Sequence, residues 1–114
     1  MLDTSPLSAA VERFADRLRA APQSRLQQGA AAAALDLARE LSVRAQRLEA
    51  PGRAPREMPD EGLFVVGDQV AVAGRDLVEA LRGPAGAPDT AKAPSEVLDE
   101  AVSLVEQAEI RAMR

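Results

Sequence analysis

The sequence predicts an all-α protein, an antiparallel four-helix bundle that forms a dimer, and two observations support this. First, the 114 residues include 24 Ala and 13 Leu but only one Ile and two Phe, a composition that favours helices over strands. Second, all eight prolines fall between segments whose apolar residues recur with the helical period. The prolines therefore divide one domain, residues 1–114, into four expected helices, at about 6–21, 24–50, 60–82 and 95–113.

The first expected helix begins at Pro6, with Ser5 as its N-cap, because proline is favoured at the first helical position and serine before it. Its apolar residues lie three or four apart and so share one face. They are Leu7, Val11, Phe14, Leu18 and Ala21. This helix is therefore amphipathic.

The second expected helix begins at Ser24, which forms a capping-box pattern with Gln27, and ends before Pro51. Its roughly 27 residues would extend about 40 Å, whereas the roughly 16 residues of the first helix extend about 24 Å. The first helix is too short to cover the second. The end between Leu41 and Leu48 therefore requires either a later helix or a second copy of the chain.

The third segment is compatible with two structures. The residues from Leu63 to Ala73 can form two short strands joined by a type II′ turn at Gly67-Asp68. A helix explains more of the pattern, because the apolar residues keep a spacing of three or four and a lone two-stranded ribbon is marginally stable. We therefore expect a helix, with Asp60 as its N-cap.

Gly67, Ala71 and Gly74 form a patch of small residues on this third helix. A glycine inside a helix costs about 1 kcal/mol relative to alanine, so we expect a neighbouring element to approach the patch closely. Asp68 is expected to face water, because a buried charge is costly unless it is paired. Gln69 is the better candidate for a buried hydrogen bond.

Residues 83–94 are rich in Pro, Ala and Gly and lack large apolar side chains, so we expect a flexible linker there. The last helix begins near Pro94 and carries acidic residues in its first turn and Arg111 in its last turn, as the helix dipole favours. The connections between the first three helices are short enough to make consecutive helices antiparallel. An up-down bundle is the simplest packing that results.

The residue types exclude most catalytic chemistry. With no Cys and no His, the chain cannot form disulfides, the usual zinc sites, thiolate nucleophiles or imidazole acid–base groups. We therefore expect a protein without catalytic residues, cofactor or metal site. Carboxylates leave one alternative, a helical bundle that binds or hydrolyses a small molecule or a magnesium nucleotide. Its candidate residues are Asp36 and Glu40 of the second helix and the pairs Glu96/Asp99 and Glu106/Glu109 of the last. Both pairs face largely away from the apolar stripe, so we expect solvent-exposed charges rather than a binding site.

Arg44, Arg47, Arg53 and Arg56 gather around the end of the second helix and form a candidate anion-binding site. The net charge of −4 and the aromatic content of 2% argue against nucleic acid as a partner. No apolar run has the length of a membrane span, and residues 1–6 lack the features of a signal peptide. We therefore expect a cytoplasmic protein that does not enter membranes.

These observations together predict a non-enzymatic helical interaction protein that self-associates as a homodimer or docks on a partner protein, with a regulatory role as one special case. A core of small side chains buries little area per residue, so a second chain would add useful apolar burial. The candidate interface residues are Leu41, Leu48, Gly67, Ala71 and Gly74.

Overall fold

A computed structural model of the chain describes residues 2–83 and 93–114. These residues form helices and connections, without a strand among them. The four long helices are α1 (Ser5–Ala20), α3 (Ala31–Glu49), α4 (Val66–Arg82) and α5 (Pro94–Ala112). Three short pieces are α2 (Gln23–Arg25), the π-helical turn η1 (Leu26–Ala30) and the 3-10 turn η2 (Leu63–Val65). The all-α class is confirmed, and the third segment is a helix rather than a hairpin.

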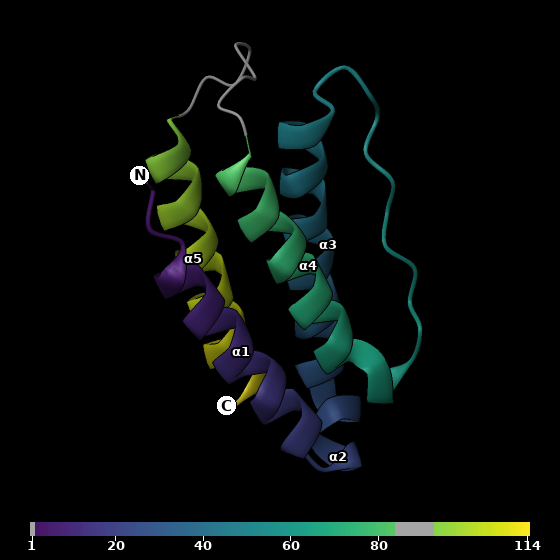
Figure 1. The fold of residues 1–114 in the computed structure, drawn as a ribbon. Helices are drawn as coiled ribbons and strands as arrows, with labels where there is room; N and C mark the ends of the chain where they lie inside the picture. The colour runs from purple at the N-terminus through teal and green to yellow at the C-terminus, as the bar shows by residue number, and fades with distance from the viewer. Residues whose placement is uncertain (1, 84–92) are drawn as a thin grey trace.

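Each long helix packs against two neighbours. Helix α1 contacts α4 and α5, and α3 contacts the same two helices. In Figure 1, α1 and α3 accordingly occupy opposite corners of a four-helix bundle, as do α4 and α5. Phe14, Leu41 and Leu77 are fully buried at its centre.

Ion pairs between helices show in which direction each helix runs. Arg19, near the end of α1, bonds to Asp68, near the start of α4, so these two helices are antiparallel. Arg44 of α3 bonds to Glu100 near the start of α5, and this pair is also antiparallel. Helices α3 and α4 instead begin at the same end of the bundle and run in the same direction (Figure 1). This differs from the antiparallel packing predicted for consecutive helices.

The cause is the connection between α3 and α4, residues 50–62, which we call the strap. The strap runs back along α3: Gln46 bonds to the backbone of Arg56, and the Nε of Arg39 donates to the carbonyl of Met58 at 2.8 Å. Thirteen extended residues reach about 40 Å, which exceeds the roughly 28 Å length of α3. Its three prolines at 51, 55 and 59 favour extended backbone over a helix. The connection therefore runs back along the length of α3 instead of forming a tight turn.

The prediction of one continuous helix over 24–50 is wrong. Gly29 has a φ of 132° inside η1, a conformation that glycine adopts readily and other residues rarely do. The long helix therefore starts only at Ala31, and Leu41 is covered by the chain itself, with 0% exposure. Of the two expected ways to cover this end, a later helix or a second copy, the later helices α4 and α5 pack on α3.

The predicted N-caps also differ from the structure. Helix α1 starts at Ser5 itself, whose backbone N–H donates to the Oδ1 of Asp3 at 3.0 Å. Ser24 lies inside α2, which starts at Gln23 without a side-chain cap. Helix α4 starts at Val66 rather than near Asp60. Of the expected linker at 83–94, residues 84–92 lie outside the described residues.

Candidate interaction surface

Exposed apolar side chains gather where the strap enters α4. Phe64 is 74% exposed, whereas the other phenylalanine, Phe14, is fully buried. Val65 follows directly and is 36% exposed, and Val72 is 47% exposed further along α4. The segment is apolar around most of its circumference, so a helix that packs one side on the bundle must leave some of these side chains outside. We call Phe64 and Val65 the Phe64 surface.

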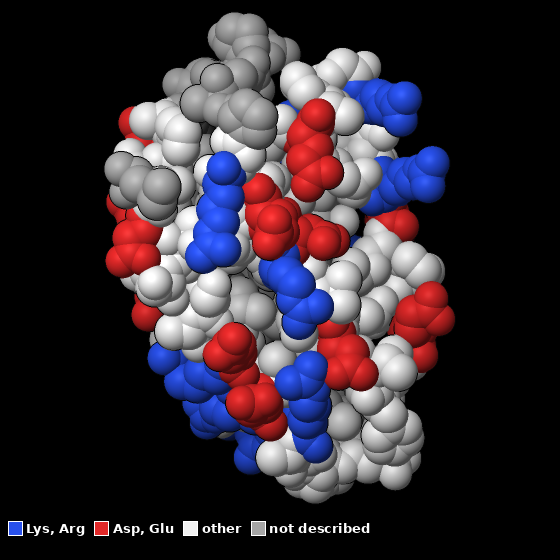
Figure 2. Space-filling model, in the orientation of Figure 1, with Lys and Arg blue, Asp and Glu red and all other residues white. Residues whose placement is uncertain are grey.

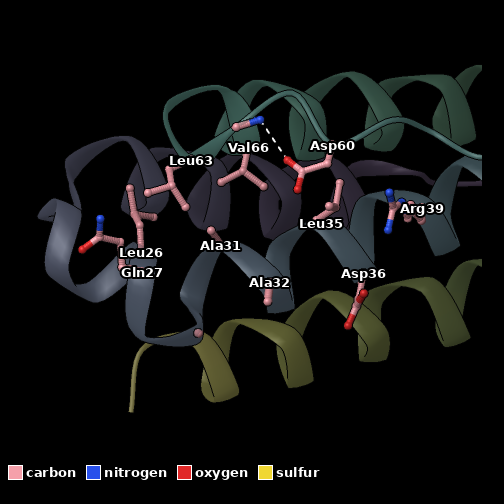
Figure 3. Close-up of a pocket in the computed structure, with 12 residues that line it drawn as sticks. Leu26, Gln27, Ala31, Ala32, Leu35, Asp36, Arg39, Asp60, Leu63 and Val66 are labelled. Carbon is pink, nitrogen blue, oxygen red and sulfur yellow. Dashed lines mark hydrogen bonds between the residues drawn. The ribbon is translucent and has the colours of Figure 1, made fainter.

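A pocket of about 360 Å³ lies beside this surface, between the start of α3 and the residues that lead into α4 (Figure 3). Its walls are mainly apolar and its rim is polar. The apolar lining residues are Leu26, Ala31, Ala32, Leu35, Leu63 and Val66, and the charged ones are Asp36, Arg39 and Asp60. Since Leu63 and Val66 line the pocket while Phe64 is exposed, the pocket and the exposed ring belong to one stretch of chain.

Two glycines shape this pocket. Gly29 and Gly62 both line it, and both have a positive φ, of 132° and 99°. The carboxylate of Asp60 accepts a hydrogen bond from the N–H of Gly62 at 2.9 Å, the dashed line in Figure 3. Asp60 therefore holds the turn that precedes Phe64, instead of capping the helix as predicted.

Of the polar pair that follows, Asp68 is exposed as predicted, whereas the hydrogen bond of Gln69 is exposed rather than buried. Asp68 is exposed and accepts hydrogen bonds from the Nε and Nη2 of Arg19 at 3.0 and 2.8 Å. This hydrogen bond raises the pKa of Arg19. Gln69 donates from its Nε2 to the carbonyl of Pro59 at 2.8 Å, while its Oε1 is buried without a partner in the described part of the chain. Gln69 thus fixes the end of the strap against α4.

The five predicted interface residues are not together on the surface. Leu41 is fully buried, and Gly67 and Gly74 are buried against α1. Leu48 and Ala71 are half-buried. The expectation that a neighbour approaches the two glycines closely is confirmed, and that neighbour is α1 of the same chain. Phe64 was not predicted as a surface residue, although the excess of apolar residues around it was a usable signal.

The four predicted anion-binding arginines are not brought together either. Arg53 and Arg56 line a second pocket, of about 260 Å³, with Glu49. Arg44 instead donates to Glu40 at 3.0 Å and to Glu100 at 2.9 Å. Arg47 is exposed and does not line that pocket. Figure 2 shows acidic and basic side chains interspersed on this face of the molecule.

Two of the six carboxylates of the alternative prediction, Glu40 and Glu109, bond to arginines. Glu109, expected at the surface, is 6% exposed and bonds to Arg13 at 3.1 Å and Arg17 at 3.0 Å. That expectation was wrong because two arginines of α1 neutralise the buried carboxylate. Glu40 bonds to Arg44. Over residues 2–83 and 93–114, no three Asp or Glu residues lie in an arrangement that could hold a metal ion.

Two further findings complete the description. None of the helices in the described part of the chain has both the length and the apolar character required to cross a membrane. In the comparisons with known proteins, no family model, no curated protein and no solved structure matches this chain.

Proposed function

We propose that this protein is a non-enzymatic interaction protein that self-associates as a homodimer, with Phe64 of each copy seated in the pocket of the other. The observation that carries the proposal is the 74% exposure of Phe64 in the same stretch of chain as Leu63 and Val66, which line a pocket with mainly apolar residues. Full burial of a phenylalanine side chain is worth about 1.5–3 kcal/mol, and aromatic side chains are enriched at the centres of protein interfaces.

A second copy is the occupant that fits this arrangement best. An exposed aromatic side chain and a pocket that are formed by the same stretch of chain can each bind their counterpart in a second copy around a two-fold axis, and such a contact closes at a dimer. The added burial also compensates for a core in which many buried residues are alanines. The proposal keeps the cytoplasmic location that the sequence predicts.

The competing function, a small-molecule or magnesium-nucleotide site, would use the same pocket and the carboxylate of Asp36. A ligand that binds only the folded chain raises its melting temperature by mass action. A panel of nucleotides with Mg²⁺ therefore separates the two functions. We expect no increase in melting temperature, because no three Asp or Glu residues of the described part of the chain lie in an arrangement that could hold the metal ion.

Two substitutions on opposite sides of the proposed contact test it. Phe64→Ser removes the inserted side chain, and Ala32→Trp fills the pocket from α3. Ile110→Ser is the matched control, because Ile110 is 59% exposed on α5, outside the Phe64 surface. We expect the first two variants to weaken dimerisation at least tenfold in light scattering after size exclusion and the control to leave it unchanged. Equal dimerisation in all three variants would contradict the contact. If the chain does not dimerise but binds a protein partner that Phe64→Ser abolishes, that partner rather than a second copy binds at the Phe64 surface.

A further inference from the structure

The strap divides the bundle into two halves that depend on each other. The N-half is residues 2–49, with α1 and α3, and the C-half is residues 63–83 and 93–114, with α4 and α5. All extensive contacts between long helices join one half to the other, because α1 and α3 each pack on α4 and α5. The two long helices of a half lie at opposite corners (Figure 1). Neither half therefore encloses a core by itself.

The ion pairs between the halves all have the same polarity. Each ion pair that crosses from one half to the other joins an arginine of the N-half to a carboxylate of the C-half, over the residues the structure describes. The pairs are Arg13 and Arg17 with Glu109, Arg19 with Asp68, and Arg44 with Glu100. Charge therefore favours an N-half against a C-half over two like halves together.

The strap that joins the halves is loosely held. Residues 51–57 are all exposed. Among the residues that the structure describes, four side chains bond to its backbone: Gln46 to Arg56, Arg39 to Met58, Gln69 to Pro59 and Asp60 to Gly62. Its thirteen residues reach about 40 Å when extended, so the strap can lead away from its own bundle as well as along it.

From these three observations we propose that two copies of the chain exchange their halves, so that α4 and α5 of each copy pack on α1 and α3 of the other. The strap acts as the hinge, and the partner is a second copy. Every contact between the halves is kept, and only the strap changes its path. The exchange uses the interior of the bundle rather than the Phe64 surface, so it can fail or succeed independently of the proposed function.

Two full-length charge-reversed chains test the exchange, and these chains and their controls all carry Phe64→Ser, so that the dimer of the proposed function does not form. One carries Glu109→Arg and the other carries Arg13→Glu with Arg17→Glu. In either variant alone, residues 13, 17 and 109 carry charges of the same sign, whether or not the halves are exchanged. Exchange of halves between the two variants restores opposite charges in both bundles of the dimer. The matched control is a pair with Arg47→Glu and Glu106→Arg, two exposed positions that form none of the contacts between halves.

The variants are unfolded in urea, refolded separately or mixed, and measured by light scattering and thermal unfolding. We expect the mixture alone to give twice the 12.0 kDa chain mass and to recover the melting temperature of the chain that carries only Phe64→Ser. The control mixture is expected to show no such gain. A charge-reversed mixture with the mass and melting temperature of its separate components would overturn the proposal, as would a dimer formed equally by either variant alone.

Discussion

Gly74 of α4 lies directly against Val11 of α1: a Cβ placed at residue 74 would be 2.6 Å from the Cγ1 of Val11. A valine side chain has few rotamers and cannot move aside easily. Gly74→Ala should therefore destabilise the protein by up to about 2 kcal/mol, since overpacking costs about 1–3 kcal/mol and the gain in helix propensity offsets about 1 kcal/mol of this cost. Urea unfolding measures this difference.

The control for this close approach is Val11→Ala, which makes room at residue 74. In a chain with Val11→Ala, the same Gly74→Ala change should be neutral or stabilising. Gly52→Ala, where an added Cβ meets nothing within 4 Å, should have little effect. If Gly74→Ala costs the same with and without Val11, the two helices do not approach as described.

Glu109 should contribute far more to stability than its neighbour Glu106. Its side chain is 8% exposed and accepts hydrogen bonds from Arg13 and Arg17, and hydrogen bonds to charged groups are worth about 1.5–3 kcal/mol. We expect Glu109→Gln to lower the free energy of unfolding by about 2 kcal/mol. Glu106→Gln, at an exposed position of the same helix, should change it by less than about 0.5 kcal/mol. Equal effects in urea unfolding would show that the buried pairs do not form.

The amide of Gln46 should control how often the strap opens. Its Nε2 donates to the carbonyl of Arg56 at 2.9 Å, and its Oε1 accepts from the N–H of Arg56 at 2.8 Å. Gln46→Ala should therefore increase the rate of tryptic cleavage after Arg53 and Arg56 several-fold, because a released segment is cut faster. Gln107→Ala removes a similar amide bond to Ser103 on α5 and should leave this rate unchanged. A rate that is the same in all three proteins would contradict the role of Gln46.

The start of α1 should lose stability in acid. Hydrogen bonds from the side chain and the backbone N–H of Ser5 lower the pKa of Asp3 in the folded protein, relative to about 3.9 in an unfolded chain. The folded state therefore binds the proton less well, so this stabilisation is present above pH 4 and is lost as the pH falls through the lower, folded pKa. An NMR titration of the Asp3 carboxyl carbon should show the lowered value, and Ser5→Ala should raise it. A pKa at or above the unfolded value would contradict the bond.

Sequence periodicity was sufficient to predict the helices but not their directions. The spacing of three and four in the third segment identified α4 correctly, and the small residues Gly67 and Gly74 correctly indicated a close approach. The direction of α4 depends on whether the strap turns sharply or returns along α3. The path of the strap is determined by a few hydrogen bonds between residues that are distant in the sequence, such as Arg39 to Met58. Such bonds produce no periodic pattern in the sequence.

The candidate surface could not be predicted from the sequence for a related reason. A helical stripe assigns apolar residues to the core, and Phe64 belongs to the same apolar run as Val66 and Val70, which are buried. Only the positions of Gly29 and Gly62 in the folded chain show that the run begins outside the bundle and borders a pocket. Likewise, Glu109 resembles an exposed helical carboxylate until α1 places two arginines over it.

Self-association is the central claim, and the mass of the unmodified chain in solution tests it most directly. Light scattering after size exclusion should be performed at chain concentrations from about 10 µM to about 500 µM, a range that brackets weak to moderate dimers of about −5 to −7 kcal/mol. We expect the mass to rise from 12.0 kDa towards twice that value as the concentration increases. A mass that stays at 12.0 kDa throughout this range would contradict the account.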